Sequence, residues 1–321
     1  MSHDTIILNY RKGFQPLKEA FENIGYRVVE NAWTPDLDLL ARTEICVINL
    51  YEAIRRPWAA VRLKHRLKQA GVPLIGLDRD APWHMGIRWR RLALFRLLRP
   101  LDIYASHTRQ STWDFAPTKI YSPNAVWTRN FNLHGHTLED MRNPDFYEYD
   151  VSFLGNMDGQ RYKEHAERAR FFTELKTRLE ALGLRHYIQH SSGISEEEQI
   201  RVIQRSRINL SYRSSCDHGG VLSWGLPERC YGVPARGGFL LTDERRHAAD
   251  DFDLTTEWTG FTDLDDCVEK IRYWLAHFAE SRSIAEAAHA RVMRDHTYEQ
   301  RARNLVVVSN ERLHLQNQRS N

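Results

Sequence analysis

The 321-residue sequence contains no run of about 18 apolar residues, which excludes a membrane-spanning helix. The first residues, MSHDTIILNY, lack a cationic segment followed by a long apolar one, so we expect no signal peptide. The four cysteines (Cys46, Cys216, Cys230 and Cys267) form no C-x-x-C pair, which argues against a zinc site or a disulfide framework and favours the reducing cytoplasm. No low-complexity tract occurs, and the length predicts two domains.

Charge is distributed unevenly along the chain. Residues 1–130 contain 20 lysines and arginines against 12 acidic residues, whereas the remainder contains 25 against 30. Much of the excess lies between Arg55 and Arg99 and includes the cationic, amphipathic segment 85–100. One interpretation is that these arginines extend from helices into water. The other is that the N-terminal half meets a phosphate-bearing acceptor, an anionic membrane surface or nucleic acid.

Short apolar segments alternate with segments of helical periodicity in both halves of the chain. Strands are expected at 5–10, 26–32, 44–50, 72–78, 102–106 and 119–123, and then at 150–159, 185–190, 208–213 and 237–243. Helices are expected between most of them, and two helices, 264–279 and 297–313, close the chain. This alternation predicts an α/β protein with two Rossmann-like domains. No G-x-G-x-x-G follows the first strand, which counts against a dehydrogenase.

The segment 126–149 is rich in Asn, His and Pro and lacks apolar periodicity, so we interpret it as an interdomain linker. The predicted organisation is an N-terminal domain at 1–125, this linker, a C-terminal domain at 150–295, and a final helix at 296–321 that packs back toward the N-terminal domain. An interdomain cleft would then face the carboxyl ends of the strands, where open sheets bind ligands.

The segment PERCYGVPARGGFLLTD (227–243) predicts a helix start, a tight turn at 232–234 and a buried strand. Glu228 stands at the helix start, where its carboxylate can accept two hydroxyl hydrogen bonds from a ligand. The alternative role is stabilisation of the helix N-terminus, which is worth about 0.3–1 kcal/mol.

Two segments, LPERCYGVPARGGFLLTDERR (226–246) and HTYEQRARNLV (296–306), resemble the C-terminal domain of CgeB-like (spore-maturation-type) glycosyltransferases. FLGN (153–156) and SPNAVWTRNF (122–131) support the resemblance, which covers about residues 119–310. The resemblance implies the GT-B fold and transfer of a sugar from a nucleoside-diphosphate sugar, most often a UDP-sugar, to an acceptor hydroxyl without a metal ion.

The resemblance also implies roles for the two domains. The C-terminal domain would bind the donor, with Glu228 holding the ribose hydroxyls, and the N-terminal domain would present the acceptor. Family members often have a further Glu where this sequence has Gly220. The resemblance favours retention of the anomeric configuration, but this substitution leaves the stereochemistry open.

Seven residues of the C-terminal half are candidates for the donor diphosphate, because amides beside glycines and cationic side chains bind phosphate. They are Gly155, Asn156, Arg161, Arg213, His218, Gly219 and Gly220. His218 can donate a hydrogen bond to phosphate or to a sugar hydroxyl, and it is also a catalytic candidate. Arg213 can neutralise the charge that develops on the leaving diphosphate. The alternatives are a plain turn at 217–220 and surface arginines.

The acceptor candidates follow strands of the N-terminal half. Asp80 or His84, in LDRDAPWHMG (77–86), can act as the base that deprotonates the acceptor hydroxyl; the alternative is a capped turn. Tyr10, Arg11, Lys12 and Gly13 form a candidate acceptor loop after the first strand. His134 and His136 lack a third ligand at useful spacing, so no metal or other cofactor is expected.

Two other functions fit the same residues. One is a DNA-modifying glycosyltransferase of the phage type, which the basic and aromatic residues of 85–100 permit. The other is a non-catalytic two-lobed protein that binds a nucleotide or sugar. The expected location is the cytoplasm, with attachment to the inner face of a membrane as one option.

Overall fold

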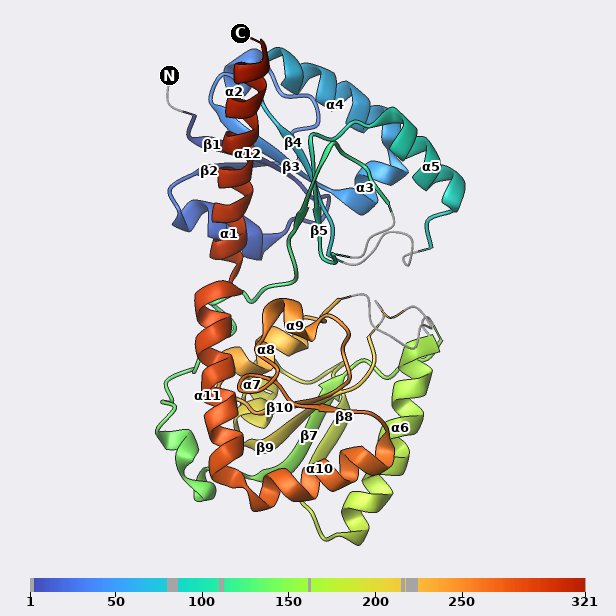
Figure 1. Ribbon diagram of the computed structural model, residues 1–321, viewed down its shortest axis with the longest axis vertical. Helices are drawn as coiled ribbons and strands as arrows, with labels where there is room; N and C mark the ends of the chain where they lie inside the picture. Colours follow the sequence, from blue (N-terminus) through green and yellow to red (C-terminus); the bar gives the residue numbers. More distant parts are fainter. Residues whose placement is uncertain are drawn as a thin grey trace. The chain divides into compact units, whose positions relative to one another are not determined.

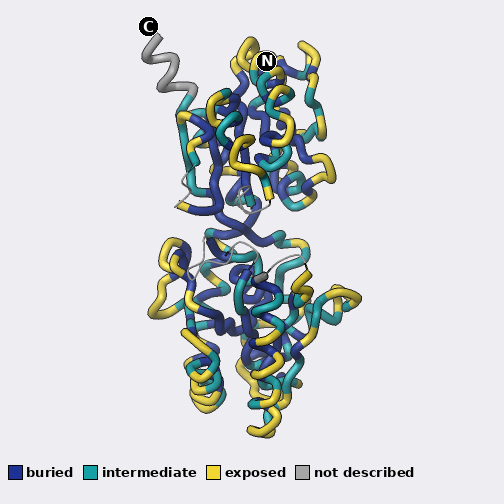
Figure 2. Tube along the Cα trace, turned by 90° about the vertical axis from the view of Figure 1, so that its right-hand side faces the viewer, coloured by how far each residue is buried: buried dark blue, intermediate teal, exposed yellow. Residues whose placement is uncertain are grey.

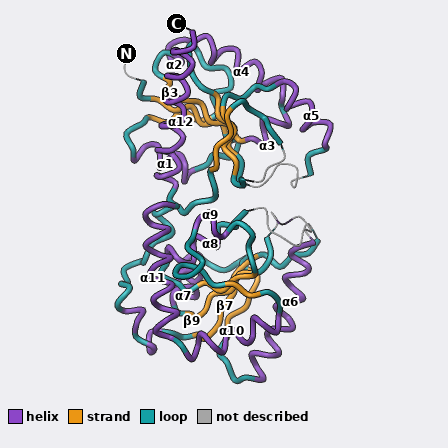
Figure 3. Tube along the Cα trace, in the orientation of Figure 1, coloured by secondary structure: helices purple, strands orange, loops and turns teal. Residues whose placement is uncertain are grey.

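A computed structural model describes residues 3–79, 86–109, 113–160, 163–214, 217 and 225–320. The chain forms two compact units (Figure 1). Unit 1 consists of Met1–Pro123 and Tyr298–Asn321, and unit 2 consists of Asn124–Thr297. Each unit is an α/β domain built on one parallel sheet, as the alternation in the sequence predicts (Figure 3).

Unit 1 is built on a six-stranded sheet with the order β2-β1-β3-β4-β5-β6, and all of its strand pairs are parallel. Its strands are β1 (Thr5–Asn9), β2 (Arg27–Glu30), β3 (Thr43–Asn49), β4 (Leu74–Leu77), β5 (Ile103–Ser106) and β6 (Thr118–Tyr121). Its helices are α1 (Gln15–Asn23), α2 (Leu37–Leu40), α3 (Leu50–Arg55), α4 (Pro57–Gln69), α5 (Trp89–Leu98) and α12 (Tyr298–Ser320). Every residue of β1, β4 and β5 is buried, because helices cover both faces of the sheet (Figure 2).

The C-terminal helix α12 belongs to unit 1, where it lies beside α1 (Figure 1). The Tyr298 ring at its start meets the Phe14 ring edge-on at 5.2 Å. The Arg301 guanidinium donates a 3.0 Å hydrogen bond to the Pro123 carbonyl, where the chain leaves unit 1 for the first time. The last helix therefore completes a domain that the first third of the chain begins.

Unit 2 is built on a five-stranded parallel sheet with the order β11-β10-β9-β7-β8. Its strands are β7 (Tyr149–Gly155), β8 (His186–His190), β9 (Ser206–Ser211), β10 (Leu240–Asp243) and β11 (Gly260–Phe261). Its helices are α6 (Lys163–Ala181), α7 (Glu196–Gln204), α8 (Arg229–Ala235), α9 (Ala248–Asp251), α10 (Leu264–Ala276) and α11 (Phe278–Asp295). The Phe153 and Phe172 rings stack at 3.8 Å and join β7 to α6 in the core.

The segment 126–149 lies within unit 2, where it contains the short 3-10 helices Asp140–Arg142 and Pro144–Phe146. The Tyr147 hydroxyl donates a 2.6 Å hydrogen bond to the Met141 carbonyl and ties the two turns together. Val126 and Met141 are buried, and Phe131 packs against the core of unit 2, but these apolar residues are irregularly spaced, so apolar periodicity could not reveal that the segment is ordered.

Two expectations about the last third of the chain were wrong. Three helices close the chain instead of two. The additional helix, α11, occupies the residues that were expected to connect the last two helices. Residues 232–234 lie inside α8, and the chain turns at Gly237, whose φ of 76° ends the helix as glycine commonly does. Gly232 instead makes room for the Phe131 ring, which a Cβ atom would approach to 2.6 Å.

Among the helices in the described part of the chain, none combines the length and apolar character needed to cross a bilayer.

Candidate functional site

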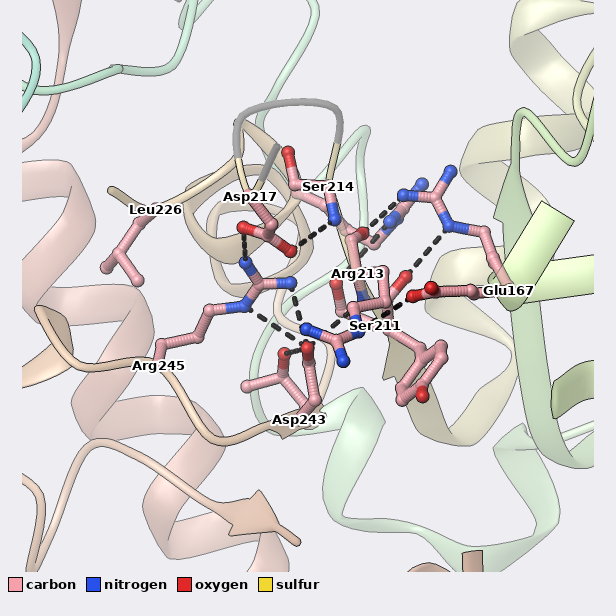
Figure 4. A network of polar contacts seen from close by, with 12 residues as sticks. Glu167, Ser211, Arg213, Ser214, Asp217, Leu226, Asp243 and Arg245 are labelled. Atoms are coloured by element: carbon pink, nitrogen blue, oxygen red, sulfur yellow. Dashed lines mark hydrogen bonds and ion pairs between the residues drawn. The ribbon is translucent and has the colours of Figure 1, made fainter. Parts of the chain in front are cut away.

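Charged side chains gather in unit 2 at the carboxyl ends of β7, β9 and β10, the central strands of its sheet (Figure 4). In parallel α/β sheets this edge is where ligands bind. We call the set the arginine cluster, and its members are Arg168, Arg213, Asp217, Arg229, Asp243 and Arg245.

Arg245 is the buried centre of the cluster, with a side chain that has no solvent exposure. Its guanidinium donates to Asp217 at 2.7 Å and to Asp243 at 2.9 Å (Figure 4). Burial opposes its charge, but Asp243 and Asp217 outweigh that effect and raise the pKa of Arg245. The same carboxylates accept hydrogen bonds from the backbone amides of Ser214 at 2.7 Å and Arg213 at 3.2 Å. The ion pairs therefore fix the loop that follows β9.

Arg168 extends from α6 and ties two loops together through backbone carbonyls. Its guanidinium donates to Asn156 at 2.6 Å, to Tyr212 at 2.8 Å and to the carbonyl of Arg213. Burial lowers the pKa of Arg168, and the positive charges of Arg229 and Arg245 lower it further. Arg168 thereby holds the loop after β7 against the loop after β9, in which Arg213 adopts a φ of 53°.

Arg229 is a half-buried cation at the same edge of the sheet. Its guanidinium donates to the Leu154 carbonyl at 2.7 Å and to the Ser211 hydroxyl at 3.4 Å, and it lies 4.8 Å from the centre of the Phe153 ring. Within the described part of the chain no carboxylate forms an ion pair with it. Burial lowers the pKa of Arg229, and because arginine remains protonated in proteins, its charge can stabilise an anionic ligand bound beside it.

Gly155, the last residue of β7, leaves the space that Arg229 occupies. A Cβ atom at this position would overlap the Arg229 guanidinium and approach the Phe153 ring to 2.7 Å. The sequence predicts that Gly155 is a glycine that binds the donor phosphate. In the structure the Arg229 guanidinium lies against it.

Gly155→Ala should therefore displace Arg229 and destabilise the protein by about 1–3 kcal/mol, the usual effect of overpacking. Urea denaturation measures this change. Gly260→Ala is the matched control, because a Cβ atom there meets nothing closer than 3.7 Å. Equal stability of the two variants would show that Arg229 does not lie against Gly155.

The structure brings several donor candidates together around Arg229. Glu228 is half-buried at the start of α8, and Arg213 is half-buried after β9, with its Nε 3.6 Å from Glu167. The exposed Asn156 side chain accepts a 2.7 Å hydrogen bond from the Asp158 amide in a tight turn. The remaining donor candidates, which are Arg161, His218, Gly219 and Gly220, lie outside the described residues.

Sequence reasoning missed Arg168, Arg229 and Arg245. A usable signal existed for two of them: Arg229 directly follows Glu228, and Arg245 follows an apolar strand at its ligand-facing end. Arg168 carried no such signal, because it is one of many charged residues along a long helix.

In unit 1, the acceptor candidates Tyr10, Lys12 and Gly13 line a pocket of about 280 Å³ at the carboxyl ends of β1, β3 and β4. The backbone amide of Arg11, in the same loop, donates a 3.1 Å hydrogen bond to the carboxylate of Glu52, which also lines the pocket. Gly13 takes a φ of 73°, which lets this loop turn tightly after β1. Burial raises the pKa of Tyr10, whose hydroxyl has no hydrogen-bond partner among the described residues.

The proposed bases Asp80 and His84 lie outside the described residues. Asp78, from the same segment, is described and buried. Its carboxylate accepts hydrogen bonds from the Tyr104 hydroxyl at 2.5 Å and from the amide and ring Nδ1 of His107 at 2.8 and 2.6 Å. Because the Asp78 carboxylate accepts hydrogen bonds from these donors, it joins the end of β4 to β5.

Within the described ranges, no three or more His, Cys, Asp or Glu side chains are placed to hold a metal ion. His134 lies in a loop with a φ of 46° and donates a 3.1 Å hydrogen bond to the Asn130 carbonyl.

A family model described as glycosyl transferase-like matches residues 124–306, more than half of the chain. The chain belongs to this glycosyl transferase-like family. The matched region includes all of unit 2 and therefore the whole arginine cluster. No curated protein matches the sequence.

Solved structures of similar fold cover nearly the whole chain. Sucrose-phosphate synthase from Thermosynechococcus elongatus matches with a TM-score of 0.62 and 11% identity over 99% of this chain and 100% of its own. Anabaena HepE in complex with UDP-glucose matches with a TM-score of 0.55 and 11% identity over 97% and 98%. An α-glucosyltransferase in complex with UDP and DNA matches with a TM-score of 0.57 and 13% identity over 95% and 99%. These likenesses show that the two α/β domains have the GT-B fold of the glycosyltransferase family.

Proposed function

We propose that this glycosyltransferase moves a sugar from a UDP-sugar to an acceptor hydroxyl and needs no metal ion. The observation that carries the proposal is Arg229, a half-buried cation at the ligand-binding edge of the unit 2 sheet that forms no ion pair with a carboxylate of the described residues. The complexes of Anabaena HepE with UDP and with UDP-glucose favour uridine as the nucleoside. The motifs that resemble CgeB-like enzymes favour that subtype.

The residues around Arg229 suit the chemistry of a departing nucleoside diphosphate. Arg229 and Arg213 supply fixed positive charge where the diphosphate gains negative charge, which is the main electrostatic requirement of the step. In a reaction without a metal ion, these arginines stabilise the negative charge that a metal ion would otherwise stabilise. Glu228, which stands next to Arg229 in the chain, accepts hydrogen bonds from the ribose hydroxyls. The reaction we favour retains the anomeric configuration and transfers a hexose.

The acceptor we propose is an anionic glycoconjugate. A second pocket in unit 1, of about 280 Å³, is lined by Tyr51, Arg55, Arg88 and Arg91. Among the described residues that line it none is acidic, and the first turn of α5, which contributes Arg91, has no acidic residue either. Such a pocket attracts phosphate or another anion. The protein would act in the cytoplasm, and at the inner face of a membrane where the acceptor is lipid-linked.

DNA is the second candidate acceptor, because one structural relative was solved with DNA and because the same arginines suit a phosphate backbone. Strong, salt-dependent binding of duplex DNA by the protein would favour this alternative. Nucleotide binding without any transfer of sugar would favour the non-catalytic alternative.

A thermal-shift screen with UDP, GDP, dTDP, CMP and NAD tests the donor site. UDP at 100 times its Kd should stabilise the protein by about 2.7 kcal/mol. Glu228→Ala should lose most of this stabilisation, whereas Glu244→Ala, at an exposed carboxylate after β10, should keep it. A shift with another nucleoside diphosphate would correct the donor, and no shift with any of them would reject the transferase proposal.

A further inference from the structure

A pocket of about 400 Å³ lies beside the edge strand β11 of unit 2. One wall is the segment 258–260, and the other is one face of α10. The α10 residues that line the pocket recur at helical spacing, so they project from the same side of the helix: Asp266, Glu269, Lys270, Tyr273 and Trp274. The pocket thus has one helical wall and one wall formed by the start of β11 and the two residues before it, and we call it the Trp258 pocket.

The Trp258 pocket is separate from the arginine cluster. Gly260 pairs with Thr242 and Phe261 with Asp243, so Trp258 precedes β11 on the side of the strand amino ends. Trp274 packs on Phe239, which also precedes its strand, with ring centres 5.3 Å apart. The arginine cluster lies at the carboxyl ends of the strands and shares no residue with the pocket.

Aromatic rings give the pocket fixed, flat apolar surfaces. The Trp258 ring packs against Phe252 at 5.2 Å, so its inner face is anchored in the core. The Trp274 ring is anchored on Phe239 and meets the Tyr273 ring edge-on at 4.9 Å. The Trp258 indole N–H makes no hydrogen bond within the described residues, so it can donate to a ligand. Flat rings with a polar edge suit a ligand with both apolar faces and hydroxyl groups.

The polar groups of the pocket favour a neutral ligand. Lys270 donates to the Gly260 carbonyl at 2.5 Å and lies 3.3 Å from the Asp266 carboxylate, so its charge is already engaged. Glu269 is exposed and makes no hydrogen bond or ion pair within the described part of the chain. With two carboxylates and one ammonium the pocket repels phosphates, while its carboxylates accept hydrogen bonds from hydroxyl groups.

We propose that the Trp258 pocket binds a neutral saccharide, whose ring stacks on the tryptophans and whose hydroxyls donate to Glu269. This saccharide binding goes beyond the proposed function, because no sugar is transferred in the Trp258 pocket. If that function holds, it retains a glycan acceptor or product on unit 2 away from the site of transfer.

Titration of the full-length, ¹⁵N-labelled protein with glucose, N-acetylglucosamine and maltotriose tests the proposal. The sequence has nine tryptophans, and their indole N–H signals can be assigned by single Trp→Phe variants. At least one saccharide should shift the signals of Trp258 and Trp274 and leave that of Trp89, an exposed tryptophan of unit 1, unchanged. Glucose 6-phosphate should bind more weakly than glucose, because the pocket carries net negative charge.

Glu269→Gln should weaken saccharide binding about tenfold, since a hydrogen bond to a charged acceptor becomes one to a neutral acceptor. Glu244→Gln is the matched control at an exposed position outside the pocket, and it should bind like the wild type. Both substitutions are at exposed side chains, so both variants should fold. Unchanged affinity in Glu269→Gln, or no indole shift with any saccharide, would overturn the proposal.

UDP separates this inference from the proposed function. UDP should stabilise the protein without shifting the indole signals of Trp258 and Trp274. UDP binding without saccharide binding rejects the pocket and leaves the transferase standing. Saccharide binding without binding of UDP or any other nucleotide of the screen supports the pocket and rejects the transferase proposal.

Discussion

An Arg245→Met variant is expected to lose about 3–5 kcal/mol of its free energy of unfolding, the cost of breaking a buried ion pair from one side. Methionine fills much of the arginine volume, but it leaves the carboxylates of Asp217 and Asp243 without their cation. Both carboxylates are largely buried, with side-chain exposures of 1% and 12%, so water cannot replace the lost partner fully. The loop after β9 loses its anchor at the same time.

Urea denaturation followed by circular dichroism measures this loss. The matched control is Arg294→Met, because the Arg294 side chain is 62% exposed and its pair with Asp295 is worth about 0–1 kcal/mol. Asp217→Asn added to Arg245→Met should recover part of the stability, since it removes one of the stranded charges. A loss in Arg245→Met no larger than that of the control would contradict the buried network.

Arg229→Met should lose donor binding while the fold stays at least as stable. Arg229 is half-buried and forms no ion pair with a carboxylate of the described residues, so its replacement by an apolar side chain removes a desolvation cost. The same change removes a charged hydrogen-bond donor from the diphosphate, a contact worth about 1.5–3 kcal/mol, and should weaken UDP binding about tenfold to hundredfold. Opposite effects on stability and affinity are typical of a functional residue that costs stability.

Calorimetric titration of UDP and urea denaturation, carried out on the same preparation, measure the two effects. Arg185→Met provides the control, because this exposed arginine pairs with Asp150 away from the cluster and should leave UDP affinity unchanged. A variant that binds UDP as the wild type does would remove Arg229 from the donor site. A large loss of stability would assign Arg229 a structural role instead.

All strands of both sheets except the two-residue β11 could be predicted from the sequence, because most are short segments rich in apolar residues and bounded by turn residues. β1, for example, is TIILN, and all five of its residues are buried. The parallel order of the strands follows from the helices between them. The placement of Glu228 at a helix start was also readable, since Pro227 and the glycines that follow are local signals.

Local patterns could not identify the charged network or the Trp258 pocket. Asp217 and Arg245 are 28 positions apart, and they meet only because β9 and β10 are neighbours in the sheet. Arg168 binds three carbonyls of two different loops, a role that no spacing within α6 could indicate.

The sequence by itself determined most of the elements, the α/β class and the glycosyltransferase family of this protein, because apolar periodicity and short motifs act over a few residues. Only the tertiary structure decided which charges are paired and which cation stays without an acidic partner. Pairing depends on burial and on contacts between segments far apart in the chain. Arg245 and Arg229 are both arginines beside strands of one sheet, yet folding places carboxylates against Arg245 and, among the described residues, none against Arg229.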